Sequence, residues 1–407
     1  MQITEAPVTL LPVQTVKPLA QPRIHALPSR FMELDGLRGL CALCVVLYHY
    51  LSGPAIYSDT ASRIRELIYV SPFTVDMFFI LSGFLVGGIL LNTRTSPNYY
   101  KTFYLRRLYR VAPIYYFWIA AFVAAALCIP AARASLLPKS FGSLAFVAGC
   151  VFFVQNFPRF PVWLTRAHWF STTWTLAIEE HFYMLAPLCL HRVGRRRLIG
   201  GLAAIIVLSP FARTFAWHFN SMKDATELDG GVANLWTPFR ADGLAMGILL
   251  AILWQTPHIK AWICKHVKWI YSGLVLGAPV CVGIEYMVVK HVRYADALAV
   301  GFGRSAVEVW SLCLIFVALM YQGTEKVSFM RWRPFREVGK ISYCVYLIHW
   351  GVLWAVLTFG LHALPGTSVR SDALASVIAL ILTFGLSALS WKYFEGPLQK
   401  RGHRFTY

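Results

Sequence analysis

Long apolar runs recur along this 407-residue chain, and they limit its fold more than any other feature. As α-helices, most of these runs are long enough to cross the hydrocarbon core of a bilayer. A backbone in lipid must satisfy its own hydrogen bonds, and the short alternating strands of a membrane barrel are absent, so a bundle of transmembrane helices is expected. The runs fall at 37–52, 73–91, 111–129, 143–155, 174–190, 199–215, 239–255, 269–288, 306–321, 342–360 and 373–391.

The positions of Lys and Arg choose among the possible topologies. If every run spans, the basic segment RVGRRR at 192–197 faces outside, against the positive-inside rule. The run at 143–155 is short and is followed by QNFPRFP, which interrupts a helix. Treating it as a re-entrant or interfacial segment leaves about ten transmembrane helices with both termini cytoplasmic. We therefore expect an all-α, multi-pass protein of the inner (plasma) membrane.

A single membrane domain accounts for most of the chain. Residues 1–31 are Pro-rich and lack the apolar core of a signal peptide, so they predict a disordered cytoplasmic tail. The membrane domain is expected at 32–400, and a short cytoplasmic tail at 401–407. The formal charge of +19 fits basic loops beside anionic lipid headgroups and gives no reason to expect a nucleic-acid partner. The sequence carries no signal for an oligomeric state.

Metal ligands are not predicted. Cys41 and Cys44 have CxxC spacing, but no second pair completes a zinc site, and the nine cysteines lie mostly inside apolar runs. We interpret them as small packing residues. The histidines outside the first span likewise show no spacing typical of metal ligands.

The first apolar run carries two ionisable residues, within the segment LDGLRGLCALCVVLYHY at 34–50. Arg38 and His49 are eleven residues apart, so on a helix they share one face and are separated by about 16 Å along its axis. Arg38 then lies near the cytoplasm and His49 in the outer half of the membrane. His49 is either a histidine satisfied by helix packing or a functional base, and the arginine on the same face favours function.

Other ionisable or polar residues within the spans collect in the outer half of the bilayer. Such groups are costly in lipid and usually face a cavity, a partner or a substrate path. The topology places eight of them there or towards mid-membrane: Asp76, Glu179, Glu180, Arg240, Asp242, Tyr343, Tyr346 and His349.

Three arginines mark the cytoplasmic start of another span. LRRLYR at 105–110 supplies Arg106, Arg107 and Arg110, and guanidinium groups suit phosphates well. An ordinary positive-inside cluster is an equally good interpretation of these residues alone. Together with a histidine and carboxylates further out, however, they indicate group transfer from a cytoplasmic phosphate-bearing donor to an extracytoplasmic hydroxyl.

Seven segments carry a resemblance to a known family. They are Arg38-x10-His49, DMFFILSGFL at 76–85, RRLYR at 106–110, WTLAIEEHFYMLAP at 174–187, FRADGLAMG at 239–247, GKISYCVYLIHW at 339–350 and YFEGPL at 393–398. In this order, over about residues 32–400, the chain resembles the acyltransferase 3 family of integral-membrane acyltransferases.

The resemblance implies a ten-helix core and transfer of an acyl group, most often acetyl, from cytoplasmic acyl-CoA to a hydroxyl of a carbohydrate or glycolipid. Acyl-CoA is then the donor substrate, and no permanently bound cofactor is expected. The resemblance also implies that His49 is catalytic and that Arg38, Arg106, Arg107 and Arg110 hold the donor.

The remaining polar residues in the spans receive roles by hypothesis. We expect His49 to deprotonate the acceptor hydroxyl, oriented by Asp76 or Glu180, with a covalent acyl-histidine as the less favoured variant. Glu180 could instead organise Arg240 structurally. We assign Arg240, Asp242, Tyr343 and His349 to the substrate path, while helix-to-helix hydrogen bonding stays open for Tyr343 and His349. Arg240 and Asp242 do not share a helix face, so each is expected to find a partner on another helix.

Two rival functions belong to other classes. A secondary transporter or lipid-carrier flippase also needs charges in the membrane, but it predicts inverted repeats and helices broken in matching halves, which the sequence lacks. An intramembrane hydrolase would need a nucleophile motif, and LSGF at 81–84 lacks the Gly-x-Ser-x-Gly elbow.

Overall fold

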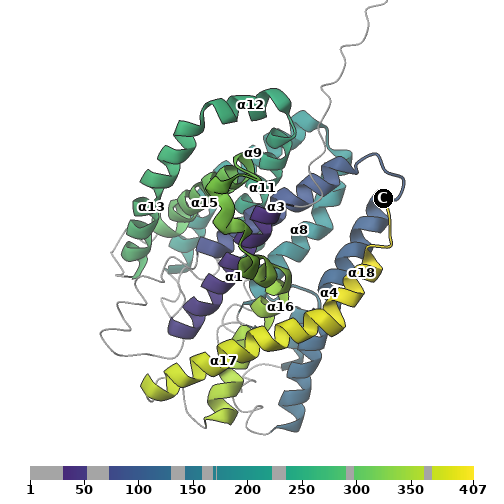
Figure 1. Cartoon of the computed structure of the whole chain (residues 1–407), viewed down its shortest axis with the longest axis vertical. Coiled ribbons are helices and arrows are strands. Elements are labelled where there is room, and N and C mark those ends of the chain that lie inside the picture. Colours follow the sequence, from purple (N-terminus) through teal and green to yellow (C-terminus); the bar gives the residue numbers. More distant parts are fainter. Residues whose placement is uncertain are drawn as a thin grey trace, which may run out of the picture.

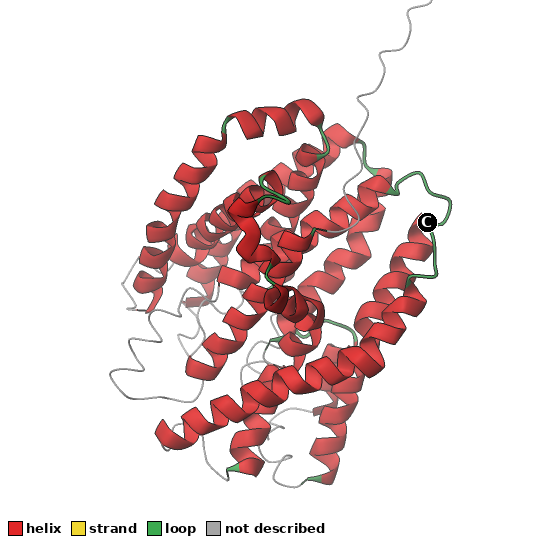
Figure 2. Ribbon diagram, in the orientation of Figure 1, coloured by secondary structure: helices red, strands yellow, loops and turns green. Residues whose placement is uncertain are grey.

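The fold is a bundle of helices, and in a computed structural model no strand occurs among the residues described (Figure 2). The structure describes residues 31–52, 73–129, 143–157, 168–170, 172–221, 235–289, 298–361 and 369–407. The α-helices are α1 (Met32–Ser52), α3 (Phe73–Asn92), α4 (Tyr99–Cys128), α6 (Ser143–Val151), α8 (Thr173–Arg192), α9 (Arg195–Ser221), α11 (Ala241–Trp254), α12 (Pro257–Lys265), α13 (Val267–Val289), α15 (Arg304–Met320), α16 (Arg333–Ala355), α17 (Val369–Ser390) and α18 (Gly396–Gly402). Short 3₁₀ segments are η1 (His168–Phe170), η2 (Thr237–Phe239) and η4 (Glu325–Arg331), and π segments are η3 (Ala299–Gly303), η5 (Val356–Gly360) and η6 (Trp391–Glu395).

Eight continuous helices in the described part of the chain are long and apolar enough to cross a membrane. A ninth crossing, or a re-entrant loop, is formed by α11 and α12, which meet at 102°. The remaining predicted span, at 174–190, is α8. It is a 20-residue helix that is not among the eight and carries the acidic pair of the EEHFY motif. The segment expected not to span contains α6, whose nine residues are too few to cross. The protein is therefore an all-α, multi-pass membrane protein.

Glycines allow two pairs of helices to pack with their backbones in contact. Where α1 crosses α16, a Cβ on Gly39 would overlap the carbonyl oxygen of Phe335. Where α3 crosses α11, a Cβ on Gly83 or Gly247 would overlap the opposing helix backbone in the same way. Small residues commonly drive such close packing between transmembrane helices. These two crossings hold α1, α3, α11 and α16 around the centre of the bundle (Figure 1).

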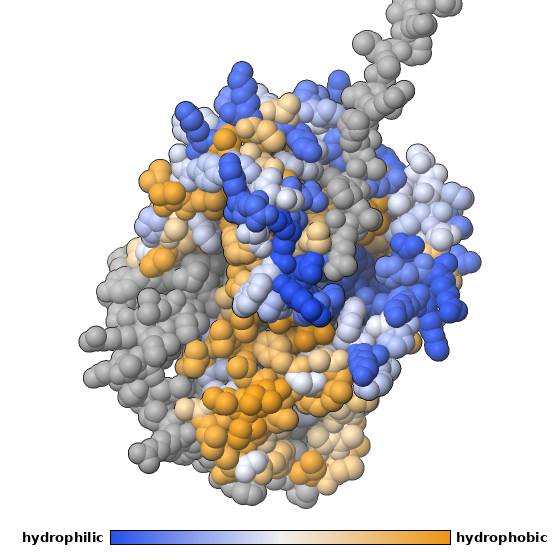
Figure 3. Space-filling model, viewed as in Figure 1, coloured by the Kyte–Doolittle hydropathy of each residue, from blue (hydrophilic) through white to orange (hydrophobic). Residues whose placement is uncertain are grey.

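The exterior carries the apolar surface expected for contact with lipid. In Figure 3, apolar side chains cover much of the lower part of the visible face, and hydrophilic ones gather along its upper and right margins. Helix α17 contributes exposed apolar residues along its length, including Leu374, Ile381 and Leu389. It continues through η6 into α18 as one long rod, whose far end lies beside α4 (Figure 1). The predicted disordered tail lies outside the described residues, except for Phe31.

Candidate active site

A cavity of about 320 Å³ lies between six helices of the bundle. Residues from α1, α3, α4, α8, α16 and α18 line it, so segments from both ends of the chain meet there. Its wall includes Phe78, Phe103 and Tyr343 among other apolar and aromatic side chains, with a few charged ones. An apolar cavity with a small number of convergent polar groups is the usual form of a ligand site.

The structure brings together all four arginines that the sequence assigns to the donor. Arg38 reaches the cavity from α1, and Arg106, Arg107 and Arg110 reach it from α4. The guanidinium of Arg107 lies over the ring of Tyr183, 4.6 Å from its centroid. An aromatic face stabilises a guanidinium and leaves its edge available for an anion. Two carboxylates, Asp35 and Glu179, line the same cavity.

Of the two adjacent acids on α8, Glu179 and not the predicted Glu180 lines the cavity. Ser82 donates a hydrogen bond of 2.6 Å to Glu179 Oε1, and the Tyr183 hydroxyl donates one of 3.2 Å to Oε2. Consecutive helical residues point about 100° apart, so only one of the pair can face the cavity. The EE pattern signals an acid at this level, but the choice between the two depends on how α8 is rotated against α3.

Tyr346 on α16 lines the cavity and lies next to a pair of histidines, His49 and His349, which do not line it. The Tyr346 ring lies 5.8 Å from the ring of His349, one turn further along the helix. His349 Nε2 lies 2.8 Å from His49 Nδ1, and the two rings stack with centroids 5.0 Å apart. His349 is fully buried, whereas His49 is partly exposed. The structure thus places His349 on His49, where the sequence had assigned it to the substrate path.

The backbone of α16 decides how the two histidines share their protons. His349 Nδ1 lies 2.7 Å from the carbonyl oxygen of Tyr346. A carbonyl oxygen can only accept, so Nδ1 of His349 carries the hydrogen, and Nε2 of the neutral ring must accept. His49 Nδ1 is therefore the donor to His349, which leaves the Nε2 lone pair of His49 available as a base.

Asp76, the first residue expected to orient His49, lies in a different network. It is ion-paired with Arg240 and lies 3.6 Å from Arg304. The guanidinium of Arg240 also lies 5.5 Å from the centroid of the Phe79 ring. Neither Asp76 nor Arg240 lines the cavity described above, so their contacts are those of helix pairing at its edge.

Asp242 belongs to the same region and pairs with Arg213, a residue that the sequence did not single out. Arg213 Nη1 lies 2.6 Å from Asp242 Oδ2, and both side chains are fully buried. Arg213 also donates to the carbonyl oxygens of Phe239 and Gly301. As expected from their spacing, Arg240 and Asp242 thus each bond to another helix. A buried glutamate, Glu308 on α15, completes the cluster, and its carboxylate accepts no hydrogen bond among the described residues.

Comparison with known proteins identifies the family of the chain. A family model described as "Acyltransferase domain" matches residues 32–392, which is most of the chain. The chain belongs to the acyltransferase 3 family. Its resemblance to that family, inferred from seven motifs, is thereby confirmed. No solved structure matches the chain.

The relatives of this acyltransferase 3 protein include O-acetyltransferases. It is 24% identical over 394 residues to the O-acetyltransferase OatA of Staphylococcus aureus. The matched region covers 93% of this chain and 58% of that protein. It is also 24% identical over 378 residues to the peptidoglycan O-acetyltransferase OatA of Listeria monocytogenes, covering 91% and 56%. The chain thus spans somewhat over half the length of the relatives it matches.

Proposed function

We propose that this protein is a membrane-bound O-acyltransferase, most simply an O-acetyltransferase. It takes an acyl group from cytoplasmic acyl-CoA and transfers it to a hydroxyl of an extracytoplasmic or lipid-linked carbohydrate. Family membership and the names of its relatives support acyl transfer to a carbohydrate. One structural observation supports the donor: four arginines line one cavity, and Tyr346 in its wall lies next to the His49–His349 pair.

The shape of acyl-CoA fits this cavity and its surroundings. The donor carries phosphates at one end and a thioester at the end of a long, uncharged arm. Arg38, Arg106, Arg107 and Arg110 would bind the phosphates, and the apolar wall near Phe78 would hold the arm. The thioester then lies near Tyr346, within reach of the histidine pair. Holding the donor and the acceptor in a reactive geometry supplies a large part of the rate acceleration that such a site can give.

His49 is the proposed base for direct transfer. Its Nε2 takes the proton of the acceptor hydroxyl as the hydroxyl oxygen bonds to the thioester carbonyl carbon. The carbon–sulfur bond then breaks, and the leaving thiolate takes the proton back from the imidazolium. His349 accepts the Nδ1 hydrogen of His49 throughout, which fixes the ring and stabilises the imidazolium, as a buried acceptor does in a catalytic triad.

The test uses purified protein in nanodiscs with radiolabelled acetyl-CoA. We expect wild type to bind the donor and to release free CoA slowly, and His49→Ala to bind it with no release. Arg107→Ala should weaken binding by about tenfold or more, because it removes a charge-assisted contact. Lys101→Ala, an exposed cation on the same helix α4 but outside the cavity, is the matched control and should bind normally.

Two results would contradict the proposal. If folded wild-type protein has no affinity for any acyl-CoA, the assignment of acyl-CoA as donor is wrong. The transporter interpretation then becomes the one to test. Labelled acyl-enzyme trapped with donor alone and lost in His49→Ala replaces direct transfer by a covalent intermediate.

A further inference from the structure

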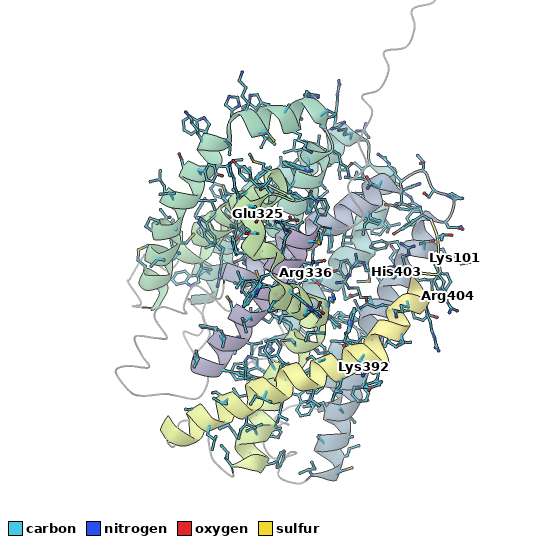
Figure 4. The ribbon with its side chains drawn as sticks, in the orientation of Figure 1. Lys101, Glu325, Arg336, Lys392, His403 and Arg404 are labelled. Atoms are coloured by element: carbon cyan, nitrogen blue, oxygen red, sulfur yellow. The ribbon has the colours of Figure 1, made fainter. Side chains whose placement is uncertain are left out.

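Helix α18 and the residues that follow it form part of the cavity wall. Gln399, His403 and Tyr407 all line it, on the side where Arg106, Arg107 and Arg110 enter. The sequence predicts only a short cytoplasmic tail at 401–407. Figure 4 places His403 at the end of α18 beside α4, with Arg404 and Lys101 near it.

Several contacts hold this segment on α4 and fix the position of His403. Gly402 is buried, and a Cβ there would lie 2.9 Å from the Cβ of Tyr109, so the chain passes α4 at close range. Thr102 donates a 2.7 Å hydrogen bond to the carbonyl oxygen of Thr406, and Arg106 Nε donates a 2.9 Å bond to that of Phe405. His403 thus lies between Gly402 on one side and Phe405 and Thr406 on the other, all three in contact with α4.

The segment also fixes one of the donor arginines. The guanidinium of Arg106 lies 5.0 Å from the centre of the Tyr407 ring, while its Nε bonds to the backbone of Phe405. Arg106 is thereby held against this segment by a hydrogen bond and an aromatic ring. An arginine whose side chain is already fixed before the donor binds loses less conformational freedom when it binds a phosphate.

The charges facing His403 are mostly positive. Cations lie on the neighbouring helix and across the cavity, and carboxylates are fewer. The titratable and charged groups around it are Lys101, Arg106, Arg107, Tyr109 and Arg110 on α4, Asp35 and Arg38 on α1, Glu179 and Tyr183 on α8, Tyr343 and Tyr346 on α16, and Arg401, Arg404 and Tyr407 on its own segment.

We infer that His403 is part of the phosphate end of the donor site and takes up a proton when the phosphates of acyl-CoA bind. This inference rests on the proposed function and extends it to a residue and a linkage that the family motifs do not contain. An imidazolium beside a phosphate adds a charge-assisted hydrogen bond to those of the arginines. The neutral imidazole ring cannot form a charge-assisted hydrogen bond of this kind.

The direction of the linkage follows from the free protein. Partial burial and the nearby charges of Arg106 and Arg110 lower the pKa of His403 below its ordinary value, so the ring is neutral near pH 7. Bound phosphate favours the charged ring and raises that pKa. Between the two pKa values donor binding consumes a proton, so affinity rises as pH falls. Below the pKa of the free protein the ring is already charged and the linkage disappears.

The experiment is titration calorimetry of acetyl-CoA into the full chain in nanodiscs, at pH 7, in two buffers of unequal ionisation enthalpy. The number of protons taken up is compared between wild type and His403→Asn, so that the titration of the donor itself cancels. We expect about half a proton less for the variant. Its affinity should be roughly tenfold weaker at pH 6 and nearly unchanged at pH 8.

Two further variants separate charge from structure. His403→Arg supplies a permanent cation and should bind tightly with the same reduced proton uptake as His403→Asn, whereas a purely structural role predicts weak binding. His258→Asn, an exposed histidine on α12 away from the cavity, is the matched control and should keep the wild-type linkage.

The outcomes distinguish this inference from the proposed function. Normal donor binding with equal proton uptake in wild type and His403→Asn would sink the inference and leave the donor site standing. Folded wild type that binds no acyl-CoA would overturn both.

Discussion

At the scale of single residues, the proposed site depends on a pair of histidines whose contact cannot be predicted from the sequence. His49 and His349 are 300 positions apart, and the sequence predicts separate roles for them, as a base and as a residue of the substrate path. In the structure their rings share a 2.8 Å hydrogen bond, and the carbonyl oxygen of Tyr346 fixes which nitrogen donates. In the proposed mechanism, His349 is a positioning residue that acts through His49.

Replacing His349 should affect turnover and leave donor binding intact. His349→Ala removes the acceptor for His49 Nδ1, and we expect kcat to fall by about a hundredfold or more with an unchanged Kd for acetyl-CoA. His349→Gln, whose amide oxygen can accept the same hydrogen, should recover part of the rate. Steady-state kinetics with a soluble carbohydrate acceptor measure both effects.

The same kinetics separate this role from the one that the sequence assigned. If His349 binds acceptor, its loss raises the KM for the carbohydrate while kcat stays near wild type. His181→Ala is a suitable control, because His181 bonds to Thr237 on another part of the bundle. That variant should leave kcat close to its normal value.

At the scale of helices, glycine sets the distance between the elements that carry the site. α3 supplies Ser82 and α11 begins beside the Asp76–Arg240 pair, so their spacing positions both the cavity wall and the buried ions. Gly83 and Gly247 meet where these helices cross, with no room for a side chain. The ion pairs at the crossing are buried, so a shift of either helix would leave charges without partners, at a cost of several kcal/mol.

A side chain at this crossing should therefore destabilise the protein. We expect Gly247→Leu to lower the thermal unfolding midpoint in nanodiscs by about 5 °C or more, or to prevent folding, because the helices must separate. Gly385→Leu on α17 is the matched control, since a Cβ there has nothing within 4 Å. Equal midpoints for both variants would show that α3 and α11 do not depend on close backbone contact.

At the scale of the whole molecule, the chain closes around its own cavity. α1 and α18 come from opposite ends of the membrane domain, yet residues of both line the same space. The arginine end and the histidine end of the site are separated along α1 by about 16 Å, half the thickness of the hydrocarbon core. A site of this length can bind a donor from the cytoplasm and present its acyl group towards the outside only if the bundle has the predicted orientation.

That orientation can be tested with two native cysteines. The predicted topology puts Cys128, exposed at the end of α4, outside and Cys264, exposed on α12, in the cytoplasm. In variants that keep one of the two and no other cysteine, a membrane-impermeant maleimide should label Cys128 on intact cells and Cys264 only after permeabilisation. The reverse pattern would invert the bundle and place the arginines outside.

The sequence by itself determined the helical membrane architecture and the family, and it singled out the arginines that we propose to bind the donor. Apolar run length and the placement of basic residues are local quantities, and residues three or four apart on one helix stay together in any fold. Only the tertiary structure decided what depends on helix rotation and on contacts between distant segments. It chose Glu179 over Glu180 for the cavity, paired His349 with His49, and placed Asp76 on Arg240. It also brought His403 to the arginines, because a contact between opposite ends of a chain leaves no mark on the local pattern of either.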